Sequence, residues 1–255
     1  MPANEVEPRY SPGQVNSPKG ISAKLAARPM LARVAPFFIY AFLTAFQGKL
    51  GPDSKYWIYA VKTLLGAWVL LLVLPWVVEV KWKISWEAVL VGIGVCVFWI
   101  GLDPYYPRLG ELFQKLGFSG SAPKPDRLGD LWNPFVQYGA SVNLARFFVV
   151  VRIVGSTVIV PPIEELFYRS FLYRYLVRVD FTNVPLGRFD VSAFVITSVL
   201  FGISHGEWLA GILCGFAYQG LVCWKGRLGD AITAHAITNF LLGIWIVWKG
   251  AWQFW

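Results

Sequence analysis

The chain has 255 residues, of which 56% are hydrophobic and only 15% charged, and its mean hydropathy is +0.52. A soluble domain of this length carries more charge, so the composition excludes a soluble globular protein and indicates an integral, multi-pass membrane protein. The net charge of +8 is scattered between apolar runs and forms no basic stripe. This distribution argues against a nucleic-acid partner and favours the anionic lipid of a bilayer.

The chain divides into three regions by composition. Residues 1–29 are rich in proline, serine and basic residues and lack an apolar core, so they are predicted to form a disordered basic tail rather than a cleaved signal peptide. Residues 30–135 are expected to hold the first transmembrane helices and a polar loop over 104–135, with a short surface helix around 109–116. Residues 136–255 are expected to form a catalytic helical bundle.

About seven apolar runs are long enough to cross a hydrocarbon core of roughly 30 Å. They occupy residues 31–47, 57–78, 86–103, 143–163, 191–206, 207–224 and 228–248. The fourth run is either one long bent helix or two pieces, because Arg146 and Arg152 interrupt it and the Pro161-Pro162 pair would kink it. The two arginines are expected to reach the interface or to pair. The predicted fold is an all-α, polytopic transmembrane bundle of six to eight helices.

Lysines and arginines are distributed unevenly over the two ends of these runs. The end that carries the N-terminal tail receives eleven of them, and the opposite end receives seven. The positive-inside rule therefore places the N-terminus in the cytoplasm. We expect a multi-pass protein of the plasma membrane.

Both histidines of the chain, His205 and His235, lie in apolar runs, and a third run leads into the pair Glu164-Glu165. Ionisable groups cost several kcal/mol in hydrocarbon, which favours a functional interpretation of these residues. At a rise of about 1.5 Å per residue, Glu164 and His205 each lie roughly 21 Å from the cytoplasmic ends of their helices. We expect them to meet in one cavity that opens toward the cytoplasm.

Helical spacing assigns different positions to the neighbouring polar residues. Glu165 and Arg169 stand at i and i+4, a spacing that predicts an intrahelical ion pair with a supporting role. Glu164 points about 100° away from Glu165, which leaves it free to accept a proton as a general base. His235 and Asn239 are one turn apart and share a helix face.

Three motifs, EELFYR at 164–169, FGISH at 201–205 and HAITN at 235–239, resemble the EExxxR, FxxxH and HxxxN motifs of the CAAX protease and bacteriocin-processing family. This family comprises intramembrane endopeptidases, including the type II prenyl protease that removes the last three residues of prenylated CAAX sequences, and proteins similar to lysostaphin resistance protein A. The resemblance covers roughly residues 143–248, and it departs at Ser170, where the family usually has glycine.

The resemblance implies roles for six residues. Glu164 and His205 would activate a water, and His235 and Asn239 would stabilise the oxyanion. Glu165 and Arg169 would brace the site. The implied reaction is hydrolysis of a peptide bond near the cytoplasmic end of a membrane-associated protein or peptide, and a C-terminal CAAX sequence is one candidate substrate. The reaction would need neither a cofactor nor a covalent intermediate.

Three alternatives stay open from the sequence. A zinc metalloprotease could use Glu164, His205 and His235 as ligands, although no HExxH motif is present. A non-catalytic scaffold or bacteriocin-immunity-type protein of the same fold could bind a partner in the same cavity. A transporter could use the buried carboxylate as a proton relay, although no repeated halves are visible.

Overall fold

The computed structural model describes Leu25, residues 27–117 and residues 131–255. Within these ranges the regular structure is entirely helical and contains no strand, which confirms the predicted all-α class. The expected disorder of the N-terminal tail falls almost wholly outside the described residues, as does part of the polar loop over 104–135.

Each predicted apolar run is helical over most of its length. The helices of these runs are α2 (Pro29–Thr44), α3 (Ser54–Val73), α4 (Trp86–Leu102), α7 (Val142–Val154), α8 (Val160–Glu165), α9 (Tyr173–Val177), α10 (Val191–Ile203), α11 (Trp208–Lys225) and α12 (Gly229–Lys249). The predicted surface helix in the polar loop is present as α5 (Leu109–Lys115), and a single further turn forms α6 (Pro134–Gln137).

Four helical stretches are long and apolar enough to cross a membrane. They are Ser54–Trp76, Trp86–Lys115, Val142–Val177 and Gly229–Lys249, and α2 and α10 are apolar but shorter. Large apolar side chains on these helices point outward, and Leu71 on α3 and Val97 on α4 are 73% and 64% exposed. An outer surface of this kind suits lipid, so the chain is an integral membrane protein.

The fourth run is one continuous helix rather than two pieces. Helices α7, α8 and α9 join through two π-helical segments, Gly155–Ile159 and Leu166–Leu172. Pro161 and Pro162 lie in the first turn of α8, where a missing N–H interrupts little. The π segments accommodate the two prolines, so the chain stays helical from 142 to 177.

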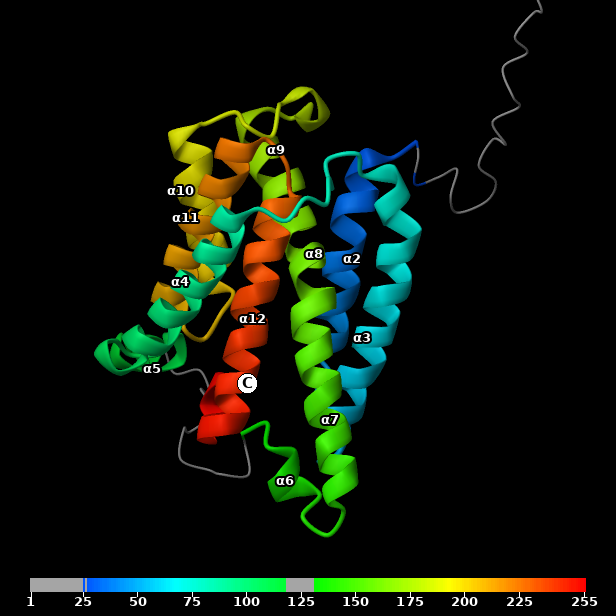
Figure 1. Ribbon diagram of the computed structural model, residues 1–255, viewed down its shortest axis with the longest axis vertical. Helices are drawn as coiled ribbons and strands as arrows, with labels where there is room; N and C mark the ends of the chain where they lie inside the picture. The colour runs from blue at the N-terminus through cyan, green and yellow to red at the C-terminus, as the bar shows by residue number, and fades with distance from the viewer. Residues whose placement is uncertain (1–24, 26, 118–130) are drawn as a thin grey trace, which may run out of the picture.

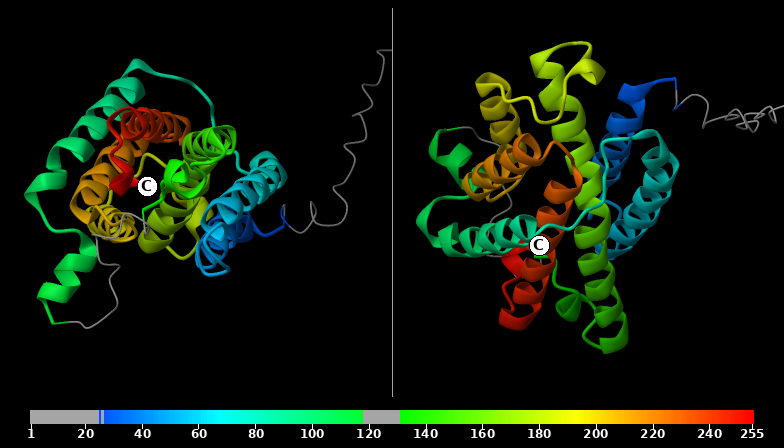
Figure 2. Two further views of the ribbon diagram at one scale, coloured as in Figure 1. Left: turned by 90° about the horizontal axis from the view of Figure 1, so that it is seen from below. Right: turned by 45° about the horizontal axis from the view of Figure 1, so that its top comes forward.

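The long helix α7–α9 lies between two groups of helices (Figure 1). Helices α2 and α3 pack together on one side of it, and α4, α10, α11 and α12 pack on the other (Figure 2). The backbones of α10 and α11 approach closely because Gly202 and Gly211 face each other, and a Cβ atom on Gly211 would lie 2.9 Å from the Gly202 Cα.

The two ends of the bundle carry different segments. Helix α2 begins at the end where the N-terminal tail joins, and the connection from α9 to α10 lies at the same end. Helices α5 and α6 and the C-terminal turn Trp252–Phe254 lie at the opposite end (Figure 1).

Candidate active site

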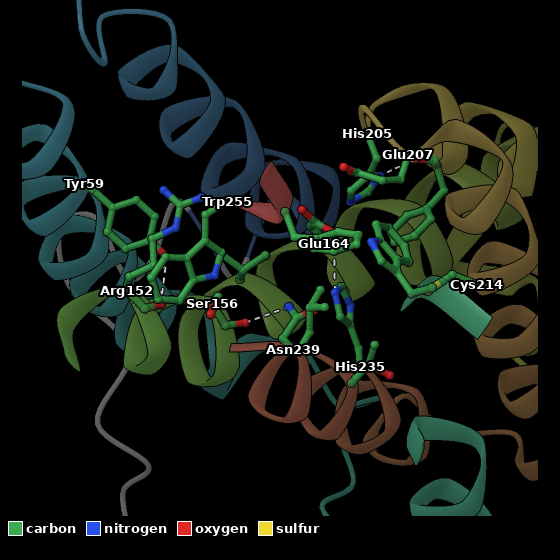
Figure 3. Close-up of a pocket in the computed structure, with 16 residues that line it drawn as sticks. Tyr59, Arg152, Ser156, Glu164, His205, Glu207, Cys214, His235, Asn239 and Trp255 are labelled. Carbon is green, nitrogen blue, oxygen red and sulfur yellow. Dashed lines mark hydrogen bonds and ion pairs between the residues drawn. The ribbon is translucent and has the colours of Figure 1, made fainter. Parts of the chain in front are cut away.

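The three motifs meet in one cavity of about 170 Å³, called the central cavity here. Glu164 reaches it from α8, His235 and Asn239 reach it from α12, and His205 reaches it from the turn after α10 (Figure 3). The convergence of three helices that the sequence predicts is therefore present in the structure.

Glu165 and Arg169 lie beside the central cavity and form the expected i,i+4 ion pair. Arg169 Nε lies 3.1 Å from Glu165 Oε2, and both side chains are fully buried. The guanidinium of Arg169 also lies 4.3 Å from the centre of the Phe201 ring. A buried charge needs a partner of this kind, so the pair can hold α8 against its neighbours.

Glu165 has a second partner that sequence reasoning missed. Its Oε1 atom lies 3.0 Å from His235 Nδ1, and the His235 ring stacks on Tyr218. A carboxylate accepts hydrogen bonds, so the network assigns the hydrogen to His235 Nδ1. Glu165 thereby fixes the orientation of His235 and leaves its Nε2 atom directed at Glu164.

Glu164 differs from Glu165 in both exposure and contacts. Its side chain is 19% exposed, and its Oε2 lies 3.9 Å from His235 Nε2, which is too long for a hydrogen bond. This oxygen has no hydrogen-bond partner in the described part of the chain. The Glu164 carboxylate is therefore available to a water molecule in the cavity.

His205 lies just beyond α10, which ends at Ile203, whereas the sequence places this histidine inside the helical run. The turn is anchored by Leu109 N–H, which donates to the Gly206 carbonyl oxygen at 3.0 Å. His205 Nδ1 lies 2.8 Å from the Phe201 carbonyl oxygen, which accepts its hydrogen and leaves Nε2 without one. His205 and Glu164 line the same cavity, but no hydrogen bond or ion pair joins them within the described residues.

Asn239 is held by a backbone carbonyl that the helix leaves free. In the π segment, Val160 N–H donates to the Gly155 carbonyl oxygen, so the next carbonyl, that of Ser156, would receive its hydrogen from residue 161. Pro161 has no N–H to donate. Asn239 Nδ2 donates to Ser156 O at 2.8 Å instead and keeps a second hydrogen for the cavity (Figure 3).

The wall of the central cavity extends to the C-terminal turn. Its lining includes Phe254 and Trp255, together with Glu207 after α10 and Tyr59 near the start of α3. The side on which the cavity opens stays a prediction.

Arg152 is a cavity residue whose environment the sequence did not predict. Its guanidinium lies over the rings of Tyr59 and Trp132 at 4.6 and 4.7 Å, and 5.6 Å from that of Trp255. From the sequence, this arginine is expected to reach the interface or to pair, and no acidic partner is found for it in the described ranges. The sequence feature that could have identified Arg152 as a site residue is the position of an arginine inside an apolar run.

Glu207 adds a carboxyl group to the cavity wall. Its Oε1 lies 3.2 Å from the Nη2 atom of Arg108. Burial raises the pKa of Glu207, although the charge of Arg108 acts in the opposite direction. This residue was not predicted as part of the site because the loop that follows His205 carries no motif.

A zinc site would need three metal-binding side chains that converge on one point. Across residues 27–117 and 131–255, no group of three His, Cys, Asp or Glu side chains is arranged to hold a metal ion. His235 Nδ1 is bonded to Glu165, which leaves Nε2 as the ring atom that could bind a metal.

Comparison with known proteins gives one family match. Residues 146–241 match the family described as Rce1-like, Type II CAAX prenyl endopeptidase Rce1-like. This match confirms the resemblance drawn from the three motifs, and the matched segment contains Glu164, His205, His235 and Asn239. No curated protein and no solved structure matches the chain.

Proposed function

We propose that this chain, whose residues 146–241 belong to the Rce1-like family of type II CAAX prenyl endopeptidases, hydrolyses a peptide bond of a membrane-associated protein. The observation that carries the proposal is the contrast between two adjacent glutamates. Glu165 is fully buried and contacts both Arg169 and His235, whereas Glu164 lines a cavity that contains both histidines and lies 3.9 Å from His235.

Each step of the proposed hydrolysis has a candidate group. Glu164 takes a proton from a water molecule, and the resulting hydroxide adds to the carbonyl carbon of the peptide bond. His205 orients the water through its free Nε2, and the proton that Glu164 took from the water passes to the leaving amine, directly or through His205, as the C–N bond breaks. The products are a carboxylate and an amine, and no covalent intermediate forms.

The oxyanion of the tetrahedral intermediate would be stabilised by Asn239 and His235. Asn239 keeps one amide hydrogen after its bond to Ser156. His235 can donate from Nε2 only when its ring carries both protons, since Nδ1 is bonded to Glu165. Donors held in place before the reaction are effective because they need no reorganisation as the charge develops.

The location of the reaction follows from the proposed topology. We propose a plasma-membrane protein with a cytoplasmic N-terminus, on the basis of the excess of basic residues at the tail end. Labelling of single cysteines at residues 83 and 249 with a membrane-impermeant maleimide in intact cells tests this topology, and labelling at residue 83 alone would contradict it.

The activity is tested with the purified protein in liposomes that contain a membrane-anchored peptide, with cleavage mapped by mass spectrometry. Prenylated and acylated versions of the same peptide show whether the substrate is of the CAAX type. We expect cleavage that persists in a strong chelator. If the chelator abolishes cleavage and added Zn²⁺ restores it, the zinc mechanism is favoured. If none of the anchored peptides is cleaved, a non-catalytic scaffold is favoured.

A further inference from the structure

The turn that carries His205 is held in place by residues of the connection between α4 and α5. Residues 204–207 join α10, which ends at Ile203, to α11, which begins at Trp208. The hydrogen bonds of the two helices fix such a turn only in part, so contacts from other segments also set its position. Residues 107–109 supply these contacts and are called the clamp segment here.

Three consecutive residues of the clamp segment contact the three residues that follow His205, in reverse order. The contacts are Leu109 N–H to the Gly206 carbonyl oxygen at 3.0 Å, Arg108 Nη2 to Glu207 Oε1 at 3.2 Å, and Trp208 Nε1–H to the Pro107 carbonyl oxygen at 3.0 Å. The two segments therefore run past each other in opposite directions. One contact alone would let the turn rotate, whereas three in succession fix its direction as well as its place.

Arg108 connects the turn to two further parts of the chain. Its Nη2 atom also lies 3.2 Å from Asp103 Oδ1, and its Nη1 atom donates to the Gln253 carbonyl oxygen at 2.7 Å. Asp103 follows α4, and Gln253 belongs to the turn after α12. The planar guanidinium offers N–H groups in fixed directions, so it can bind all three partners at once. Glu207 is thereby tied to the ends of α4 and α12.

The orientation of the His205 ring depends on the position of this turn. His205 Nδ1 lies 2.8 Å from the carbonyl oxygen of Phe201, which belongs to α10, although His205 itself lies beyond the helix. The ring also packs nearly perpendicular to that of Trp99 on α4, with 5.6 Å between the ring centres. Both contacts would change if the turn moved, and a displacement of about 1 Å in an active site can cost about 10²-fold in rate.

We propose that the clamp segment positions His205 for the hydrolysis, with Arg108 acting through Glu207. The inference rests on the proposed function and adds two positioning residues to it. The clamp segment lies outside residues 146–241, so the family match assigns it no part in the site. Arg108 is not one of the residues that line the central cavity, whereas Glu207 and His205 both are (Figure 3). The effect of Arg108 on the reaction is therefore transmitted through the turn.

The first test compares the kinetics of Arg108→Gln and wild type on one membrane-anchored peptide in liposomes. Arg108→Gln removes the ion pair with Glu207 and should lower kcat by about ten- to a hundredfold, while KM changes by less than about twofold. Arg108→Lys keeps the charge and should recover part of the loss. The matched control is Lys115→Gln, which removes an exposed positive charge from α5 and should keep the wild-type kcat.

A double-mutant cycle shows whether Arg108 acts through Glu207. Glu207→Gln should also lower kcat, and Arg108→Gln combined with Glu207→Gln should lower it no further than the larger single effect, because both changes remove the same ion pair. Effects that multiply in the double variant would show that Arg108 acts independently of Glu207 and would overturn the inference. Thermal unfolding in detergent shows that the compared variants are folded.

The second test observes the His205 ring directly by NMR. The chain contains two histidines, so a protein with isotopically labelled histidine gives ring nitrogen signals of His205 and His235 only. The variant His235→Gln assigns the two sets of signals. We expect the hydrogen of the wild-type His205 ring on Nδ1, because this atom faces the Phe201 carbonyl oxygen. Arg108→Gln should shift or broaden the His205 signals and leave those of His235 unchanged.

The two tests together distinguish this inference from the proposed function. Unchanged His205 signals in a folded Arg108→Gln protein would overturn the inference, and so would a loss of activity confined to KM. Shifted His205 signals with a wild-type kcat would remove His205 from the proposed mechanism, and the inference with it. If the wild-type protein cleaves no peptide, the proposed function fails, and the NMR signals alone still decide whether Arg108 orients the His205 ring.

Discussion

Glu164 and Glu165 show how one residue of offset changes the chemistry of a side chain. The turn of the helix directs Glu165 to Arg169 and His235, where it is fully buried, and directs Glu164 into the central cavity. The i,i+4 spacing predicted the ion pair with Arg169 because both residues lie on one helix. The bond from Glu165 to His235 depends on how α8 and α12 pack, and the spacing of residues within one helix does not predict such packing.

Replacement of the two glutamates should therefore have different effects on stability. Glu165→Gln leaves the buried Arg169 without its counter-ion, and breaking such a pair costs about 3–5 kcal/mol. Glu164→Gln removes no ion pair of this kind and should unfold near the wild-type temperature. Thermal unfolding in one detergent measures both variants, with Glu111→Gln on α5 as the control, and equal melting temperatures for the two would contradict the assignment.

At the scale of the elements, the two π segments and the residues around Ser170 position the site. The apolar pattern predicted where helices run, but the π segments that keep the chain helical through Pro161 come from its packing with α3 and α12. Ser170 stands where the family usually has glycine. Its hydroxyl accepts hydrogen bonds from Arg33 Nε at 2.8 Å and Arg174 Nη2 at 3.0 Å.

Glu79 joins the same cluster and gives it a dependence on pH. Glu79 contacts Arg33 and Arg174 from the connection between α3 and α4. Burial would raise the pKa of the Glu79 carboxyl, but the hydrogen bond from Arg33 and the charges of both arginines hold it below its usual value. The carboxylate contribution to stability is therefore complete above the unfolded pKa of about 4.3 and is lost as the pH falls through the lower folded value.

Glu79→Gln should lower the melting temperature at pH 7, because two buried arginines lose their counter-ion. It should also reduce the decline in melting temperature between about pH 5 and pH 3, since the group that binds a proton on unfolding is gone. Melting temperatures of wild type and variant across this range test both effects. An unchanged acid decline in Glu79→Gln would show that other carboxyl groups cause it.

At the scale of the whole molecule, the sequence predicted the helices and their convergence but not all of the residues that line the cavity. Apolar runs set helix positions to within a few residues, and the three motifs identified the helices that meet. No motif indicated that the C-terminal Phe254 and Trp255 also line the cavity. Arg152 has no acidic partner among the described residues, and this could not be predicted either, because it depends on every helix around it.

The most direct measurement of the central claim compares the turnover of wild type and Glu164→Gln on the same anchored peptide in the same liposomes. The amide keeps the shape of the side chain and cannot take a proton from water. The account predicts that the turnover of Glu164→Gln falls by more than about 10²-fold, which is the lower end of what a general base contributes. Glu111→Gln should retain the wild-type turnover. Near-normal turnover by a folded Glu164→Gln protein would contradict the claim that Glu164 activates the water.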